Sequence, residues 1–212
     1  MTDIEATWEF DAWAATYDSS VESSNTYYAR YREVLDFVAE TAGARQGKRI
    51  LDIGTGTGNL ALCCAGKGAA VVGLDPSQGM IEQAKLKAVG SGNVEFVAVE
   101  DPFRQILYPD SSFDAVVSTY AFHHIPHEAK PECVQEMLRV IKPDGILVLG
   151  DLMFRNTAAL KNALERFEWL EEEYFTFIDE LQALCRGLNV EVCCRQFTPV
   201  SWVVWVTIAE HS

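Results

Sequence analysis

A glycine-rich turn flanked by carboxylates is the segment of this sequence best suited to bind a small molecule. The turn runs Gly54-Thr55-Gly56-Thr57-Gly58, and Asp52 stands two residues before its first glycine. Glycines let the chain turn tightly and let a ligand approach the main chain. Asp75 follows 17 residues after Gly58, at the end of the next apolar run, where a carboxylate can accept hydrogen bonds from both hydroxyls of a ribose. The pattern therefore predicts a site for a ligand that carries a ribose.

The spacing of these glycines separates the turn from that of dinucleotide-binding proteins, whose fingerprint is G-x-G-x-x-G or A. Counted from Gly54, the third small position falls on Asn59, and counted from Gly56 it falls on Ala61 in the wrong register. Asp52 would repel a pyrophosphate, but it suits a ligand with a positive amino group, such as S-adenosylmethionine (SAM). An enzyme that uses NAD or a nucleotide sugar is therefore the disfavoured alternative.

A second group of residues with acid–base chemistry follows the fourth predicted strand. The sequence there is Ser118-Thr119-Tyr120, followed by His123-His124-Ile125-Pro126-His127. Imidazole titrates near neutral pH, so His123 or His124 could act as a general base, with Tyr120 as a third candidate. A metal site is the alternative. We expect none, because adjacent histidines do not share a face of a strand and no carboxylate stands at a ligand spacing beside them.

The charge of the chain limits its partners. Its 212 residues include 17 Lys and Arg but 31 Asp and Glu, which gives a net charge of −14, and the basic residues are scattered. Such a protein repels phosphate backbones and anionic headgroups, so neither nucleic acid nor membrane is an expected partner. The sequence has no apolar stretch of about 18 residues, and its acidic N-terminus lacks a signal-peptide pattern. We expect a cytoplasmic monomer or homodimer that acts on a small molecule.

The elements that must position these residues alternate between strands and helices. Short apolar runs predict strands at 49–53, 70–74, 94–99, 113–118 and 146–150. Helices are predicted at 59–67, after the N-cap Ser77, at about 130–141, and at about 157–173 and 177–186. Short apolar strands separated by helices indicate a parallel sheet covered on both faces. Two later strands, 189–194 and 201–206, are joined by too few residues for a crossover helix and should pair antiparallel.

No repeat or low-complexity linker divides the chain, so a single domain over residues 1–212 is expected. It is predicted to comprise an N-terminal helical cover (1–45), a SAM-binding core (46–153), a helical insertion (154–187) and a C-terminal strand pair (188–212). The cover holds aromatic residues within 8–18, and the polar stretch after them buries little. We expect residues 8–18 to form a mobile lid that the cofactor orders.

Four segments together resemble the class I SAM-dependent methyltransferases. They are Leu51 to Gly58, Val72 to Ser77 with Met80, Pro109 to Val116, and Leu138 to Gly145. The run Phe10 to Asp18 and the Trp-rich last strand extend the resemblance to the small bacterial methyltransferases of the YrrT type. This resemblance implies an α/β fold with a Rossmann-like, doubly wound sheet of seven strands. The sheet would be mostly parallel with its last strand antiparallel, and helices would precede it.

The resemblance also implies roles for the residues of the turn. Gly54 and Gly56 would face the methionine part of SAM, Asp52 would help to hold its amino group, and Asp75 would bind the ribose. Tyr17 would belong to the lid and place its aromatic face near the sulfonium, where cation–π attraction is favourable.

Further residues are assigned to the cofactor in the same way. Met80 would lie near the adenine, either Glu100 or Asp101 would meet the adenine amino group, and Ser118 would line the space near the reactive methyl. Neighbours of these residues complete the expected contacts: Thr55, Asn59, Pro76 and Ser77.

The resemblance implies transfer of the SAM methyl group to a small-molecule acceptor by in-line displacement. Such an enzyme must align a nucleophilic atom with the methyl group and exclude water. The alternative is a SAM-binding sensor or partner subunit without catalysis, which would need no acceptor pocket.

Overall fold

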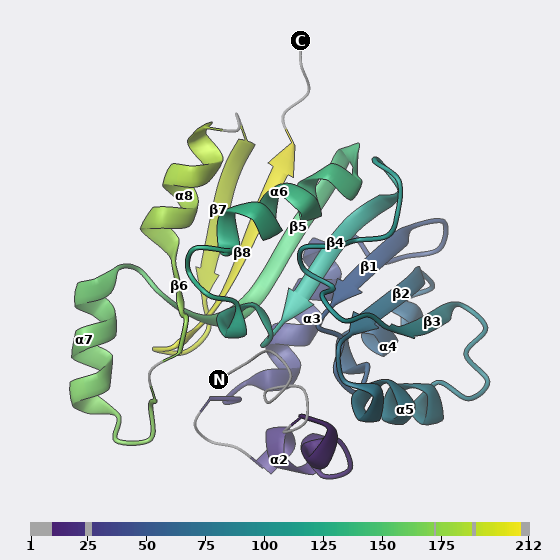
Figure 1. Cartoon of the computed structure of the whole chain (residues 1–212), viewed down its shortest axis with the longest axis horizontal. Helices are drawn as coiled ribbons and strands as arrows, with labels where there is room; N and C mark the ends of the chain where they lie inside the picture. Colours follow the sequence, from purple (N-terminus) through teal and green to yellow (C-terminus); the bar gives the residue numbers. More distant parts are fainter. Residues whose placement is uncertain (1–9, 24–26, 172, 188–189, 209–212) are drawn as a thin grey trace.

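The described chain forms one sheet with helices on both faces (Figure 1). The computed structural model describes residues 10–23, 27–171, 173–187 and 190–208. The five strands that follow the predicted alternation are β1 Arg49–Ile53, β2 Ala70–Asp75, β3 Val94–Ala98, β4 Phe113–Thr119 and β5 Ile141–Phe154. The helices between them are α4 Asn59–Gly66, α5 Gln78–Lys87 and α6 Lys130–Val140, with a short 3-10 turn, η1, at Phe122–His124.

Further elements lie before and after this core. Helices α2 Tyr17–Ser23 and α3 Tyr31–Thr41 precede it, and residues 10–13 are helical as well. Five elements follow it: α7 Thr157–Arg166, β6 Thr176–Phe177, α8 Ile178–Gly187, β7 Val190–Gln196 and β8 Ser201–Ile208. No helix in these described segments is long and apolar enough to cross a membrane.

The strand order, β3-β2-β1-β4-β5-β8-β7, confirms the doubly wound, Rossmann-like fold. Strands β1 to β5 run parallel, and β8 pairs antiparallel with both β5 and β7, as the short connection between the last two strands predicts. The sheet differs from the prediction in having an eighth strand. The two-residue β6 pairs parallel with the end of β5, and two residues are too few to leave a periodic pattern in the sequence.

The predicted helix over 157–173 is wrong in its second half, because α7 ends at Arg166. Beyond it, the Tyr27 hydroxyl donates to the carbonyl of Trp169 at 2.6 Å and accepts from the backbone N–H of Glu171 at 3.0 Å. A distant side chain therefore meets backbone groups that a longer helix would have satisfied internally. The insertion is thus part helix and part extended chain.

The core has two halves, one on each face of the sheet. On the first face α3, α4 and α5 pack on residues such as Ile50 and Val117, and on the other α6 and α8 pack on residues such as Leu51 and Val116. Each such fully buried aliphatic side chain stabilises the fold by ~1.5–3 kcal/mol. Burial on both faces explains why the strands are nearly continuous apolar runs.

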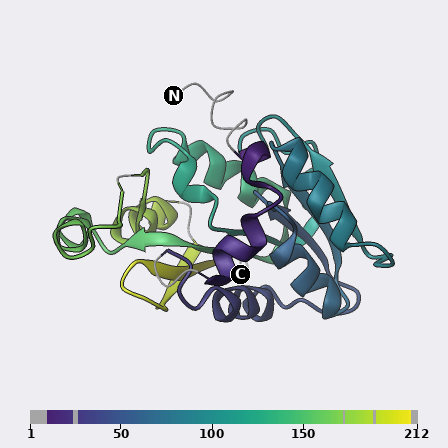
Figure 2. The same ribbon diagram turned by 90° about the horizontal axis from the view of Figure 1, so that it is seen from below.

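The N-terminal segment lies across the edge of the sheet at which β1, β2 and β4 end. In Figure 1 this is the lower edge, and the view from below shows α2 crossing it beside α3 (Figure 2). Ligands of open parallel sheets bind beyond this edge. Residues 10–23 therefore lie at this edge, whereas residues 1–9 and 24–26 lie outside the described residues, and the role of the segment as a cover stays a prediction.

Candidate functional site

The turn after β1 needs its glycines for backbone conformation and for space. Gly54, Gly56 and Gly58 have φ values of 68°, 53° and 81°, in the left-handed region that other residues adopt at a cost. A Cβ atom on Gly54 would meet Ala121 Cβ at 2.4 Å, whereas one on Gly56 would meet no protein atom within 4 Å. Gly56 therefore borders open space, and a side chain there would fill the place of a ligand.

Asp52 carries a buried carboxylate that is only partly satisfied. Its side chain is almost fully buried, and its Oδ2 accepts a hydrogen bond of 2.7 Å from the Thr55 hydroxyl. Its Oδ1 is buried and has no hydrogen-bond partner in the described part of the chain. Burial raises the pKa of Asp52 to about 7. An ammonium group would supply the missing donor, so this carboxylate fits the amino group of SAM.

Asp75 is placed beside the same turn. Its Oδ2 accepts from the backbone N–H of Gly56 at 2.8 Å and its Oδ1 from that of Ser77 at 2.9 Å. Burial raises its pKa to about 6. Each carboxylate oxygen keeps a second lone pair, so ribose hydroxyls could still donate to it. Ser77 caps α5 as predicted, since its hydroxyl accepts from the backbone N–H of Met80 at 3.1 Å.

The structure brings most of the sequence-predicted cofactor residues to this edge. Asp52, Thr55 and Gly56 stand within one turn, and Pro76 and the buried Met80 belong to the β2–α5 segment that follows Asp75. The two acids after β3 differ from each other. Asp101 forms an ion pair of 2.6 Å with Arg104, while Glu100 is exposed. The adenine role stays a prediction for both.

Two acidic residues of the N-terminal segment, not predicted from the sequence, contact this site. Asp18 accepts hydrogen bonds from the Thr57 hydroxyl at 2.6 Å, Asn59 Nδ2 at 2.9 Å and Lys87 Nζ at 2.7 Å. Asp11 accepts from the Ser77 hydroxyl at 2.5 Å and from the backbone N–H of Gly79 at 2.8 Å. Both carboxylates thus lie at helix N-termini, where the helix dipole favours negative charge. The preference of helix N-termini for negative charge is the feature from which a role for Asp11 and Asp18 could have been predicted.

Aromatic rings of the same segment cover the ends of β4 and β5. Tyr17 packs edge-on against Trp13 and Tyr28, with ring centroids 4.8 Å and 6.3 Å apart. Tyr28 in turn lies 5.2 Å from the ring of Tyr120. Phe10 lies 5.1 Å from the ring of His124. The rings of this segment therefore reach the predicted acid–base residues Tyr120 and His124, while the place of Tyr17 near the sulfonium stays a prediction.

Tyr120 and Ser118 follow each other closely at the end of β4. The Tyr120 hydroxyl lies 3.1 Å from the Ser201 hydroxyl, and burial raises the pKa of this phenol, so it holds its proton. The Ser118 hydroxyl is buried without a hydrogen-bond partner among the described residues. A free polar atom at this position fits its predicted place beside a bound ligand.

His123 and Asp151 form a buried pair that the sequence analysis did not predict. His123 Nδ1 lies 2.5 Å from Asp151 Oδ1, and the His123 backbone N–H donates to Asp151 Oδ2 at 2.9 Å. Burial alone would raise the pKa of Asp151, but the charges of His123 and Lys130 hold it below its ordinary value. The spacing of carboxylates around the histidines in the sequence does not reveal this pair. The fold brings Asp151 there from β5, 28 positions along the chain.

His124 has different surroundings. Its Nδ1 lies 3.9 Å from Glu173 Oε2, and 38% of its side chain is exposed. Partial burial, and then the neighbouring His123, lower the pKa of His124. Within the described residues, no group of three or more His, Cys, Asp or Glu side chains could hold a metal ion.

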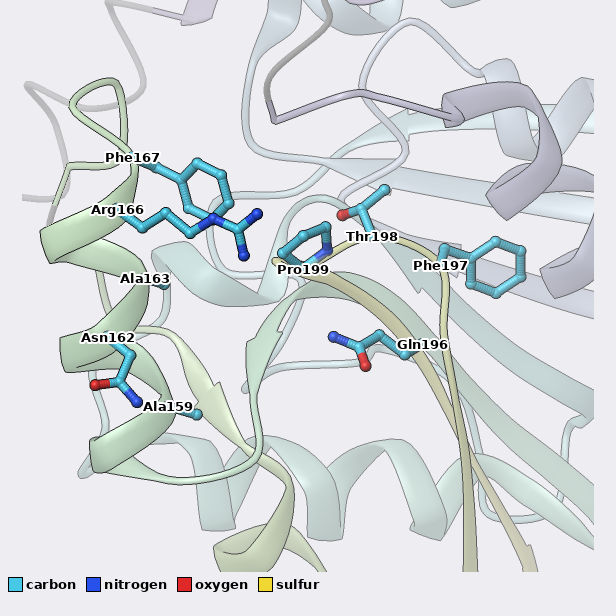
Figure 3. Close-up of a pocket in the computed structure, with 9 residues that line it drawn as sticks. All are labelled: Ala159, Asn162, Ala163, Arg166, Phe167, Gln196, Phe197, Thr198 and Pro199. Atoms are coloured by element: carbon cyan, nitrogen blue, oxygen red, sulfur yellow. The ribbon is translucent and has the colours of Figure 1, made fainter.

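A separate cavity of about 500 Å³ opens between α7 and the turn that joins β7 to β8 (Figure 3). Arg166 points from the end of α7 toward Thr198 and Pro199 across this space. The turn continues into Ser201, which contacts Tyr120. The residues that line the cavity include none of the glycine turn.

Comparison with known proteins gives the class of this protein. A family model described as "Methyltransferase domain" matches residues 50–145. The structure resembles DhpI in its DhpI-SAM-HEP complex, with a TM-score of 0.74 and 20% identity over 97% of this chain and 98% of that one. It also resembles the YcgJ protein of Bacillus subtilis, with a TM-score of 0.67 and 27% identity over 78% of this chain and 71% of that one. Fold and turn define a class I SAM-dependent methyltransferase, with SAM as its cofactor.

Similarity to a curated relative shows the family to which this chain belongs. The chain is 33% identical over 208 residues to an uncharacterized methyltransferase of Geobacillus sp. (strain WCH70), covering 92% of this chain and 94% of the relative. The protein belongs to this methyltransferase family, which confirms the class that its motifs resemble.

Proposed function

We propose that the protein transfers the methyl group of SAM to a small-molecule acceptor by in-line displacement, with His123 as the general base. The observation that carries this proposal is the buried contact of 2.5 Å between His123 Nδ1 and Asp151 Oδ1. His123 lies just beyond the end of β4, five residues after the buried Ser118 and three after the buried Tyr120, and Asp151 lies in β5 beside it.

Asp151 sets the proton positions on His123. Because the carboxylate is ionised, it accepts the Nδ1–H, and the lone pair of the neutral ring is then on Nε2. In the described part of the chain, no residue makes a hydrogen bond to His123 Nε2. This nitrogen is therefore free to take a proton from an acceptor O–H, N–H or S–H.

Bound SAM supplies a methyl group on a positively charged sulfur, which leaves as S-adenosylhomocysteine. His123 Nε2 accepts the proton of the nucleophile as the new bond to carbon forms, and the Asp151 carboxylate stabilises the resulting imidazolium. Such a base contributes roughly 10²–10⁴-fold to the rate. His124 suits this task less, because its lowered pKa makes the imidazole a weak base. Tyr120 also suits it less, because its raised pKa keeps the phenol protonated.

The surroundings of the pair support a small acceptor. Phe10 reaches His124 from the N-terminal cover, and the Tyr27 hydroxyl ties that cover to Trp169 in the insertion. These contacts bring the cover and the insertion beside the proposed base, an arrangement that favours a small acceptor over a polymer chain. The net charge of −14 also disfavours nucleic acid and fits a cytoplasmic protein, monomeric or dimeric, that acts on metabolites.

A methyl-transfer screen with labelled SAM and pooled metabolites tests the proposal. We expect label in a small product, lost by about 100-fold in His123→Asn, whereas His127→Asn serves as the matched control. SAM affinity should be equal in all three proteins. Failure to label any acceptor would favour a SAM-binding sensor. An unchanged rate in His123→Asn would favour another base.

A further inference from the structure

A buried lysine contacts the residue that precedes His123 in the chain. Lys130, at the start of α6, is 8% exposed. Its Nζ donates to the carbonyl of Phe122 at 2.6 Å and to the Thr176 hydroxyl at 3.2 Å, and it lies 4.3 Å from the centre of the Phe122 ring. Lysine is almost never fully buried unless it is paired. No carboxylate of the described residues lies within ion-pair distance of it.

The two hydrogen bonds of Lys130 join two elements that serve the reaction. Phe122 begins η1, the turn whose next residue is His123, and Thr176 belongs to β6 in the insertion. Without the lysine, the buried Phe122 carbonyl would lose a charged hydrogen bond and be left without this donor. The ammonium group therefore fixes the turn that carries the base relative to the insertion.

The charge of Lys130 also acts on the pair. The ionisable groups that face it are Asp151 from β5, Cys133 one turn along α6, and His124, whose pKa it helps to lower. Burial lowers the pKa of Lys130 to about 8, while Asp151 acts in the opposite direction. Lys130 in turn helps to keep Asp151 ionised. A buried carboxylate thus faces a buried ammonium group without touching it.

We infer that Lys130 is a positioning residue of the methyl transfer: it orients His123 through the Phe122 carbonyl, balances the charge of Asp151, and couples the insertion to the base. This inference rests on the proposed role of His123. Because a cation disfavours a second positive charge nearby, removal of Lys130 should make the imidazole of His123 easier to protonate.

Histidine-ring NMR during a pH titration tests this without an acceptor. The variants are Lys130→Met, which removes charge and donors, Lys130→Arg, which keeps the charge, and Lys161→Met on the exposed face of α7 as control. The His123 signal is assigned by its loss in His123→Asn. We expect its midpoint to rise by at least about 0.5 pH unit in Lys130→Met, to recover in Lys130→Arg, and to stay unchanged in Lys161→Met.

Kinetics with an acceptor found by the screen complete the test. In Lys130→Met, kcat should fall at least about tenfold while the Kd for SAM is unchanged. A folded Lys130→Met protein with the wild-type His123 midpoint and kcat would overturn the inference. If this variant does not fold, Lys130→Gln, which keeps a donor but not the charge, is titrated in its place with the same expectation. An effect on the midpoint together with a fully active His123→Asn would instead refute the role of His123 as the base.

Discussion

The carboxylate of Asp18 accepts a hydrogen bond of 2.6 Å from the hydroxyl of Thr57, although 39 positions separate the two residues. Thr57 belongs to the glycine turn that would face the methionine part of SAM. The same carboxylate binds Asn59 and Lys87. The N-terminal cover and the cofactor turn therefore share one polar network, and a ligand that orders the turn should also hold the cover.

We predict that residues 10–18 are ordered mainly when cofactor is bound, as expected for the longer segment 8–18, whose first two residues lie outside the described chain. They contact the rest of the protein through the hydrogen bonds of Asp11 and Asp18 and through the rings of Phe10 and Tyr17, so they should open at a lower cost than the strands of the sheet. Amide hydrogen exchange in this segment should slow when S-adenosylhomocysteine is added. The effect should be smaller in Asp18→Asn, with Asp110→Asn as a control on an exposed ion pair. Equal protection with and without ligand would make the segment part of the permanent core.

Deletion of residues 1–20 should leave a folded protein that loses methyl transfer more than stability. We expect the cover to keep water from the methyl group, whereas the main clusters of the core are centred on the sheet. Thermal unfolding and the label-transfer assay would be compared on the same preparation. A truncated protein with full activity, or one that does not fold, would contradict this prediction.

Asp75→Ala should weaken SAM binding at least about tenfold, because charged hydrogen bonds contribute ~1.5–3 kcal/mol each. The variant also removes the acceptor for the backbone N–H groups of Gly56 and Ser77, which adds to the loss. Calorimetric titration measures the affinity, with Asp144→Ala, at an exposed position of β5, as the matched control. Unchanged affinity in Asp75→Ala would remove the ribose role.

Gly56→Val should abolish cofactor binding while the fold largely survives. A Cβ at Gly56 meets no protein atom within 4 Å, so the side chain would enter ligand space instead of the core. Gly47→Val is a matched control, because Gly47 also has positive φ and open space but lies outside the turn. Circular dichroism should show similar strain in both variants, and only Gly56→Val should fail to bind SAM. Normal binding by that variant would place the cofactor elsewhere.

SAM affinity should fall as the pH is lowered through the pKa of Asp52, about 7, and then that of Asp75, about 6. Burial raises both pKa values, so the unliganded protein favours the neutral carboxyl groups. Their protonation contributes to the free energy of unfolding at low pH, and this contribution is lost as the pH rises through the two pKa values. The amino group of SAM requires the ionised form of Asp52, so its binding improves over the same range. Titrations between about pH 5.5 and 7.5 should show this slope, and Asp52→Asn should flatten its upper part. The same slope in the variant would assign it to another group.

Most of the core could be predicted from the sequence because local patterns encode it. Strand β2 follows from an apolar run. The N-cap of α5 follows from Ser77, whose hydroxyl stands three residues before Met80 and accepts a hydrogen bond from the Met80 backbone N–H. The end of α7 could not be predicted in this way. The residues after Arg166 continue a helical pattern, but the Tyr27 hydroxyl, 142 positions from Trp169, binds their backbone.

The sequence itself determined the residues of the predicted cofactor site. Gly54, Gly56 and Asp52 lie within five residues, so their geometry depends on one turn, and Asp75 ends the strand that must pair beside β1. The surroundings of the proposed base were decided by the tertiary structure. His123 meets Asp151, and Lys130 meets Thr176, only because β4, β5 and β6 end at the same edge of the sheet. No local pattern in the sequence encodes such pairs, because distant side chains meet only where the ends of whole strands lie together. Packing then removes water from around these polar groups, which makes their mutual hydrogen bonds necessary.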